Sequence, residues 1–397
     1  MADYIDAKQA ALRLGVSRQT LYAYVSRGLI KAIPADDPRQ SLYLAAAIDE
    51  IAATRKRGRK PREIAKATLD WGMPVLESGL TLIEDGQCYY RGQDAVHLSR
   101  SASLEEAAAL LWQIPVQSAF PRRAPGNLKA YAGLIEQAAG ALPSETLLPL
   151  FAVAASDDAT SAWRTEPRLL ARGSGDLVRI LAAAALRQAP QSAPVHEQLA
   201  NAWGIGAARA GLIRQALVLC ADHELNASSF TARCVASTGA SLKACIVAAL
   251  AALSGVKHGA MTTRIEHLWD SLDPQDPAKG LRDRLGAGES IPGFGHPLYP
   301  DGDIRAKALL TPILPEYKPA ARFVEAVRQL SGAEPSIDFA LVALRRYLGL
   351  PEGSAFLLFA TGRSVGWIAH ALEQRTTDQL IRPRALYTGQ RPDSVTS

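Results

Sequence analysis

Ala- and Leu-rich segments whose apolar residues recur with helical spacing dominate the chain from Glu63 onward. The clearest of them are 104–112, 128–141, 177–187, 212–220 and 241–253. Segments that alternate apolar and polar residues, as half-buried strands do, are rare. The exception is 79–91, where Asp85-Gly86 between apolar residues predicts one small hairpin. The sequence therefore predicts a mainly α-helical body.

Composition excludes several classes of protein. With 48% hydrophobic residues and a mean hydropathy of −0.01, the chain is typical of globular proteins. No apolar run reaches the roughly 20 residues that a membrane span needs, so we expect no membrane insertion. The N-terminus lacks the features of a secretory signal, which favours the cytoplasm. The four cysteines show no CxxC spacing and are expected to be buried and reduced.

Residues 1–54 differ in kind from the body and predict a small DNA-binding domain. Asp6 can cap one short helix and Ser17 a second, 18–27, which Gly28 ends. The side chains expected to face inward are Ala10, Ala11, Leu14, Leu21 and Val25. Two short helices around a glycine-containing turn are typical of a helix-turn-helix. The stretch 10–30 resembles the MerR-type and excisionase-type winged helix, with 31–43 at the position of the wing.

A basic run follows at 55–62, Arg-Lys-Arg-Gly-Arg-Lys-Pro-Arg, with six basic residues among eight. Gly58 and Pro61 keep it out of regular structure. Such a run suits contacts with phosphates or insertion into a minor groove, and residues 17–62 could then bind DNA. A solvated linker, 55–66, is the alternative interpretation.

Three histidines stand beside turn formers or polar groups: His223 in Ala-Asp-His-Glu-Leu-Asn, His258 in Gly-Val-Lys-His-Gly and His296 in Gly-Phe-Gly-His-Pro. A helix break beside a histidine leaves its ring accessible to a ligand, as an active site requires. The remaining histidines, His97, His196, His267 and His370, are expected to be structural. Because no HxxxH or HExxH pair is present, we expect no metal site. A phosphate-binding P-loop is also absent, and the lack of a G-x-S-x-G elbow argues against the nucleophile of an α/β-hydrolase.

Ordered motifs around these histidines identify the chain as a member of the citrate synthase family. The segment 217–260 resembles the stretch that carries the family's first two active-site histidines, and 291–305 resembles the third with an arginine nine positions later. Pro335-Ser-Ile-Asp-Phe339 matches the loop of the catalytic aspartate. The two C-terminal signatures correspond to 359–374 and 381–389, and 90–92 and 103–106 resemble the N-terminal hairpin and first helix.

The resemblance implies a fold and a set of catalytic roles. The body, 67–397, would consist of a large helical domain with a small domain, roughly 255–345, inserted in it. Asp338 would take a proton from the methyl group of an acyl-CoA thioester, while His258 donates a hydrogen bond to the thioester carbonyl. His296 would polarise the ketone of oxaloacetate and protonate the new alkoxide, and His223 would add a second hydrogen bond.

The substrate's carboxylates call for guanidinium groups, which bind them with paired hydrogen bonds. Arg305, Arg363 and Arg382 occupy the matching positions of the family. In the family the last of these reaches across from the neighbouring subunit, which implies a homodimer with a composite active site. The resemblance implies no metal or organic cofactor beyond the CoA thioester, which is a substrate.

The match departs from the family pattern at three places. Thr262 stands where the family has an asparagine after the second histidine, Ser336 where an asparagine is common, and Pro300 where a basic residue often contacts CoA. Three functions stay open: citrate synthase with acetyl-CoA, 2-methylcitrate synthase with propionyl-CoA, and a DNA-binding regulator whose synthase-like body senses a metabolite. One methylene in a pocket changes binding by only about 1–3 kcal/mol, so the sequence does not separate the first two.

Overall fold

The computed structural model describes the N-terminal part of the chain in short pieces and the rest almost continuously. The described residues are 4–14, 16, 21, 25, 30, 32–34, 41–45, 48–49, 76–125, 129–138, 140–155, 160–161, 163–164, 166–377 and 379–389. They fall into two compact units, Met1–Glu77 and Ser78–Ser397.

The N-terminal unit is a small antiparallel sheet with a short helix. Its elements are β1 (Tyr4–Asp6), α1 (Ala7–Leu14), β2 (Ala32–Pro34) and β3 (Ser41–Leu44), and the strand order is β1-β3-β2. The Asp6 carboxylate accepts a hydrogen bond from the backbone N–H of Gln9 at 2.8 Å, which confirms the predicted cap. Ala10, Ala11 and Leu14 are buried, as their spacing predicted.

The second predicted helix, 18–27, lies mostly outside the described residues. Leu21 and Val25 are described, and both are helical. Leu21 is fully buried, and Val25 packs partly buried against the same core. Of the predicted wing, 31–43, the two ends pair as antiparallel strands with Ala32 opposite Tyr43. The basic run 55–62 and the linker 55–66 lie outside the described residues.

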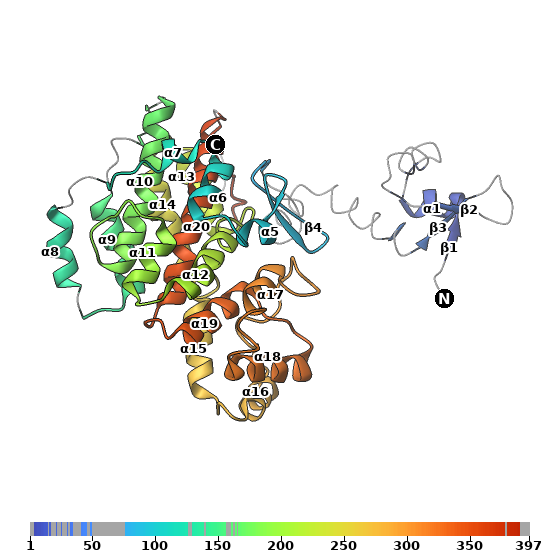
Figure 1. The fold of residues 1–397 in the computed structure, drawn as a ribbon. Helices are drawn as coiled ribbons and strands as arrows, with labels where there is room; N and C mark the ends of the chain where they lie inside the picture. The colour runs from blue at the N-terminus through green and yellow to red at the C-terminus, as the bar shows by residue number, and fades with distance from the viewer. Residues whose placement is uncertain are drawn as a thin grey trace, which may run out of the picture. The chain divides into compact units, whose positions relative to one another are not determined.

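The body is mainly helical, as the spacing of its apolar residues predicted (Figure 1). Its elements are β4 (Thr81–Glu84), β5 (Gln87–Tyr90), β6 (Gln93–Asp94), α5 (Ala95–Ser99), α6 (Leu104–Trp112), α7 (Val116–Ala119), α8 (Lys129–Gln137), α9 (Pro143–Ala154), α10 (Pro167–Leu186), α11 (Val195–Ala202), α12 (Ala207–Leu219), α13 (Ala227–Ala236), α14 (Leu242–Leu253), α15 (Met261–Ser271), α16 (Pro277–Gly286), α17 (Ile304–Leu310), α18 (Lys318–Ser331), α19 (Ile337–Leu348) and α20 (Ser354–Arg375).

Local sequence signals account for several boundaries. Asp85 and Gly86 adopt positive φ values of 50° and 72°, which turns β4 into β5 as the hairpin prediction required. Ser103 and Glu106 form a reciprocal capping box at the start of α6. The side chain of Asn226 accepts hydrogen bonds from two backbone N–H groups and so caps α13.

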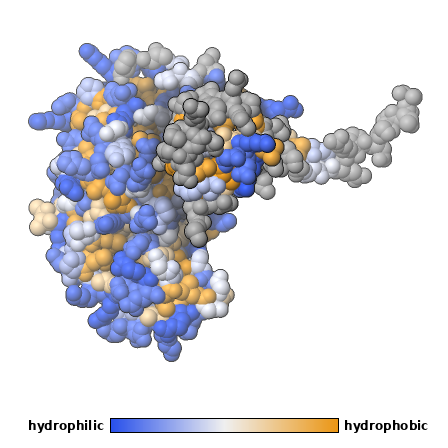
Figure 2. Space-filling view, turned by 90° about the vertical axis from the view of Figure 1, so that its right-hand side faces the viewer, coloured by the Kyte–Doolittle hydropathy of each residue, from blue (hydrophilic) through white to orange (hydrophobic). Residues whose placement is uncertain are grey.

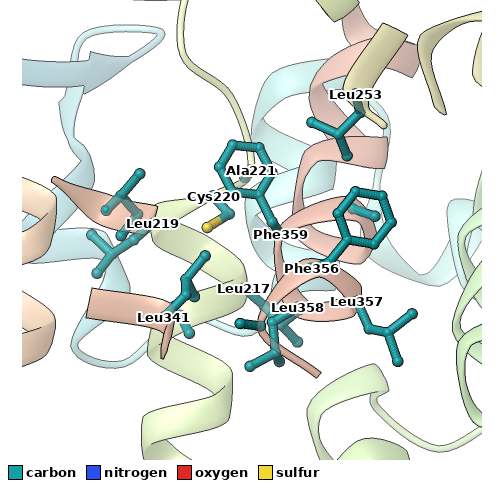
Figure 3. Close-up of a cluster of buried hydrophobic side chains, with 14 of the residues drawn as sticks. Leu217, Leu219, Cys220, Ala221, Leu253, Leu341, Phe356, Leu357, Leu358 and Phe359 are labelled. Atoms are coloured by element: carbon teal, nitrogen blue, oxygen red, sulfur yellow. The ribbon is translucent and has the colours of Figure 1, made fainter. Parts of the chain in front are cut away.

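Helix α20 lies at the centre of the body, with α6, α12, α13 and α14 around it (Figure 1). A Cβ atom at Gly362 would lie 2.6 Å from the carbonyl oxygen of Leu217, so glycine lets α12 approach α20 closely. Phe356 and Phe359 of α20 pack in one hydrophobic cluster with Cys220 and with Leu341 of α19 (Figure 3). In the described part of the chain, α20 is the helix long and apolar enough to cross a membrane, but 94% of its most apolar window is buried inside the protein.

Helices α15 to α19 gather at one end of the body (Figure 1). Their core is aromatic: Trp269 stacks on Phe339 with ring centroids 5.2 Å apart, and Phe294 lies 4.7 Å from Phe339. Hydrophilic residues cover much of the face of the molecule drawn in Figure 2, with apolar residues between them. Figure 3 lies where α12, α19 and α20 meet; of the predicted site residues, Asp338 stands on α19, Arg363 on α20 and His223 in the turn after α12.

Candidate active site

The loop that carries His296 is hydrogen-bonded to the segment that leads into α19, whose first turn carries Asp338. The backbone N–H of Gly295 donates to Glu334 O at 2.8 Å, and that of Ser336 donates to Gly293 O at 2.8 Å. Gly293 has a φ of 83°, a conformation that side chains with a Cβ rarely adopt. These two hydrogen bonds flank the antiparallel bridge between Phe294 and Pro335. They therefore fix the backbone next to His296 relative to the backbone that leads into Asp338.

His223 and His296 lie side by side, and Tyr299, from the same loop as His296, contacts both rings. The two imidazole rings meet edge to face with centroids 5.2 Å apart. The Nε2 atom of His223 is 3.0 Å from the hydroxyl of Tyr299, which is almost fully buried. The Nδ1 atom of His296 accepts a hydrogen bond from the backbone N–H of Leu298 at 3.2 Å, so the Nε2 atom carries the ring proton in the neutral form.

His258 is held by the first turn of α13. Its Nε2 atom lies 2.8 Å from the hydroxyl oxygen of Ser228, to which the indole N–H of Trp367 also donates at 3.0 Å. In this structure the Ser228 hydroxyl donates its one proton to the Oδ1 atom of Asn226 at 2.8 Å, an oxygen that also accepts from two backbone N–H groups, so a bond from this hydroxyl to His258 requires that proton to turn away from Asn226. When the hydroxyl donates to His258, the ring proton sits on Nδ1 and can be donated from there.

Arg305 forms a buried ion pair within its own segment. Its Nε and NH2 groups donate to the two carboxylate oxygens of Asp303 at 2.9 and 2.8 Å. Asp303 also accepts from the backbone N–H of Ile337 at 3.0 Å, next to Asp338. Both side chains are nearly inaccessible to solvent. The guanidinium of Arg305, which the family resemblance assigns to a substrate carboxylate, is therefore bonded to the carboxylate of Asp303 in this structure. Its role in binding substrate stays a prediction.

Arg363 projects from the middle of α20 and is almost fully buried. Its Nε group donates to the carbonyl oxygen of Cys220 at 2.8 Å, and its guanidinium lies 5.0 Å from the ring centroid of Phe359. Arg382, in contrast, is exposed in the C-terminal segment 379–389 and is not brought to the other site residues within this chain. Its role across a subunit boundary stays a prediction.

Burial raises the pKa of the predicted catalytic aspartate and lowers the pKa values of the three histidines. Removal of Asp338 from solvent raises its pKa to about 6, although the charges of Arg305 and Arg363 oppose this. Burial lowers the pKa of His258 and of His296 to about 4, and Arg363 and Arg305 respectively reinforce the effect. The pKa of His223 is lowered well below its usual value by burial and then by nearby positive charges. At neutral pH the predicted site residues therefore include neutral imidazoles and a carboxylate that can accept a proton.

Sequence inspection missed Ser228, Tyr299 and Asp303, which hold the predicted residues. Ser228 contacts His258, 30 positions away, and Tyr299 contacts His223, 76 positions away, so no local sequence pattern indicates either contact. Asp303 had a local signal, because an aspartate directly before a helix is a frequent N-cap, and it caps α17. A cavity of about 430 Å³ lies elsewhere, between α5 and α6, and none of the predicted site residues lines it. Within the described residues, no group of three or more His, Cys, Asp or Glu side chains could hold a metal ion.

Comparison with known proteins gives the family of the chain. The sequence model described as "Citrate synthase, C-terminal domain" matches residues 68–384. A citrate synthase of Haloferax volcanii is 31% identical over 81% of this chain and 95% of its own length. A 2-methylcitrate synthase of Shewanella oneidensis is 34% identical over 45% of this chain and 50% of its own length. The crystal structure of a citrate synthase from Thermotoga maritima superposes with a TM-score of 0.67 and 26% identity, covering 80% of this chain and 94% of that one. Since the match extends over most of the sequence and most of the fold, the chain belongs to the citrate synthase family.

Proposed function

We propose that the protein condenses acetyl-CoA with oxaloacetate and water to give citrate and CoA. The observation that carries the proposal is the joining of the His296 loop to the segment that leads into Asp338, which puts a carboxyl group of raised pKa on the same backbone frame as a neutral imidazole. A thioester methyl group is a very weak acid, so its deprotonation needs a positioned base and a hydrogen-bond donor for the enol oxygen. The site contains groups of both kinds.

In the first step Asp338 takes a proton from the acetyl methyl group as the enol forms. A pKa of about 6 leaves Asp338 mostly ionised at neutral pH and brings it closer to the ideal for a base than an ordinary aspartate. His258 donates from Nδ1 to the thioester oxygen, provided that Ser228 donates to its Nε2 atom. One such donor typically contributes about 3–4 kcal/mol to the stability of the transition state.

In the second step the enol carbon attacks the ketone of oxaloacetate. His296 polarises the ketone oxygen through its Nε2 proton and supplies the proton that the new alkoxide needs. His223 lies against His296 and adds a hydrogen bond to the same substrate. Water then cleaves the citryl thioester, and the proposal includes no metal or organic cofactor besides CoA as a substrate.

Arginine side chains bind the carboxylates of oxaloacetate. Arg363 is the best placed, because it is buried next to Cys220 and no carboxylate among the described residues contacts its guanidinium. Arg305 would share its fork between Asp303 and the substrate. Arg382 would come from the partner subunit of a homodimer, which also accounts for its exposed position in the single chain.

Propionyl-CoA is the alternative acyl donor. The similarity to the Shewanella 2-methylcitrate synthase, confined to half of that protein, supports keeping this reaction as a candidate. One additional methylene changes binding by about 1–3 kcal/mol, so the choice depends on a pocket wall that the sequence does not identify.

The deciding experiment measures free CoA released with oxaloacetate and either acetyl-CoA or propionyl-CoA. Asp338→Ala serves as the blank, and the ratio of the two rates names the preferred donor. Release that depends on oxaloacetate and on Asp338 is the expected result. No release by a folded dimer that binds oxaloacetate would contradict the proposal and favour the metabolite-sensing regulator.

We further propose that the body divides into a large domain and a small one at roughly 255–345, and that residues 1–54 form a winged helix-turn-helix that binds DNA. In support, the N-terminal unit has its own buried core. Its helix α1, the helical and buried Leu21 and the antiparallel ends of the predicted wing fit that arrangement. A dimer would present two such units, as palindromic operators require.

Fluorescence anisotropy with labelled random-sequence duplex DNA tests this second proposal. The full chain should bind in a salt-dependent manner, because phosphate contacts release counterions. Arg18→Ala/Arg27→Ala should weaken binding, whereas Arg13→Ala should not, because Arg13 pairs with Asp49 at 2.9 Å. Binding that is absent, or equal in the three proteins, would refute it.

A further inference from the structure

A buried pair of side chains, Asp222 and His370, adjoins the site without a part in the proposed chemistry. Both side chains are fully buried, and the Nε2 atom of His370 lies 3.3 Å from the Oδ1 atom of Asp222. Asp222 stands in the turn after α12, and His370 stands in the second half of α20. Removing a carboxylate from water is costly unless a cation or hydrogen bonds compensate it, so a fully buried aspartate in this place calls for an explanation.

Three separate elements fix Asp222. The hydroxyl of Thr81 in β4 donates to its Oδ2 atom, and the hydroxyl of Tyr90 in β5 donates to its backbone carbonyl at 3.1 Å. A Cβ atom at position 366 would overlap the Oδ1 atom, so the carboxylate has room because α20 carries Gly366 there. The turn is thus held by the hairpin on one side and by α20 on the other.

The same turn carries two groups of the proposed site. His223 is the next residue, and Cys220, two residues earlier, accepts the hydrogen bond of Arg363 Nε at 2.8 Å. Asp222 is also the charge that most raises the pKa of Arg363, against the lowering effect of burial. The Asp222 carboxylate therefore lies within reach of two side chains, the His370 imidazole and the Arg363 guanidinium, and can interact with either of them.

We propose that Asp222 and His370 are positioning residues: the pair fixes the turn that bears His223 and keeps the Asp222 carboxylate on His370, so that the Arg363 guanidinium stays available to the oxo acid. This inference rests on the proposed binding of oxaloacetate by Arg363. It goes beyond the expectation that His370 is structural, and the two differ in outcome, since a purely structural pair would have no specific effect on one substrate.

His370→Gln tests the pair in the full chain, with KM measured separately for oxaloacetate and for acetyl-CoA. Without the imidazole, Asp222 turns to Arg363 and competes with the substrate carboxylate. The KM for oxaloacetate should rise about tenfold or more, the scale of coupling between neighbouring charged groups, while the KM for acetyl-CoA changes little. His97→Gln, the same substitution at an exposed position of α5, is the matched control and should leave both constants unchanged.

The double variant Asp222→Asn/His370→Gln separates charge from shape. It replaces the carboxylate and the imidazole with two neutral amides, so oxaloacetate KM should return to within roughly threefold of the wild-type value. Should His370→Gln fail to fold, Thr81→Val removes one hydrogen bond to Asp222 and should raise the same constant more weakly.

An equal rise of both KM values, or an unchanged oxaloacetate KM in a folded His370→Gln protein, would overturn the inference. So would a double variant no better than the single one. Calorimetric titration with oxaloacetate distinguishes this failure from failure of the proposed function. A wild-type protein that binds oxaloacetate without releasing CoA would refute the synthase, whereas the binding constants of the variants would still test the pair.

Discussion

Replacing Asp338 with asparagine should stabilise the protein while abolishing its turnover. Burial raises the pKa of this carboxyl from 3.8 to about 6, which means that the folded state disfavours its charged form. A tenfold change in proton affinity corresponds to about 1.4 kcal/mol, so the full shift amounts to about 3 kcal/mol. Because the side chain is not wholly shielded from solvent, we expect a gain of roughly 1–3 kcal/mol at pH 8.

The sign of this effect depends on pH in a defined way. Above about pH 6 the wild-type carboxylate is charged in both states, and the folded protein carries the full cost of burying it. As the pH falls from 6 to 3.8, the folded state takes up the proton first, and the wild type recovers stability relative to the variant. The advantage of Asp338→Asn should therefore be largest at pH 8 and vanish near pH 4.

Urea unfolding followed by circular dichroism at pH 8, 6 and 4.5 measures this difference. Asp301→Asn, which changes an exposed aspartate in a nearby loop, is the matched control and should give no pH-dependent difference. The burial argument would be refuted if the Asp338→Asn protein were less stable than the wild type at pH 8. It would also be refuted if the two free energies of unfolding differed by the same amount at every pH. Retention of near-normal turnover would refute the assignment of Asp338 as the base.

Other predictions use the same assays. Steady-state kcat/KM should fall tenfold per pH unit below about pH 6, because protonated Asp338 cannot act as a base. Ser228→Ala should lower kcat about tenfold to a hundredfold with oxaloacetate affinity preserved by calorimetry, since it removes the partner that sets the proton of His258. Gly293→Ala should cost about 2–4 kcal/mol in urea unfolding, because φ is 83° and the new Cβ would lie 2.5 Å from Ile265 Cδ1.

The helical body and the hairpin were predictable because their signals are local. Helix α6 coincides with the predicted 104–112, and Asp85-Gly86 turns as its residue types require. The three histidines and Asp338 were found through motifs whose order along the chain resembles the family. The structure then places His223 against His296 and joins the loops of His296 and Asp338.

The partners of these residues were not predictable, because they come from distant parts of the chain. Tyr299 meets His223 across 76 positions, and their contact depends on how the loop after α16 folds back. The ion pair between Arg305 and Asp303 was not predicted either, although the two residues are only two positions apart in the sequence. Sequence patterns indicate that an arginine occupies a carboxylate-binding position, but only packing determines which carboxylate is present.

The departure of Thr262 from the family pattern bears less on catalysis than its position next to the second histidine suggests. Its hydroxyl donates to the carbonyl oxygen of Gly259 at 2.9 Å and is satisfied within its own turn. The ring of His258 contacts Ser228 instead, which the Asn226 cap and Trp367 hold in place from α13 and α20. Since those two helices belong to the packed centre of the body, the orientation of His258 depends on the central packing, which loss of an amide at position 262 leaves intact.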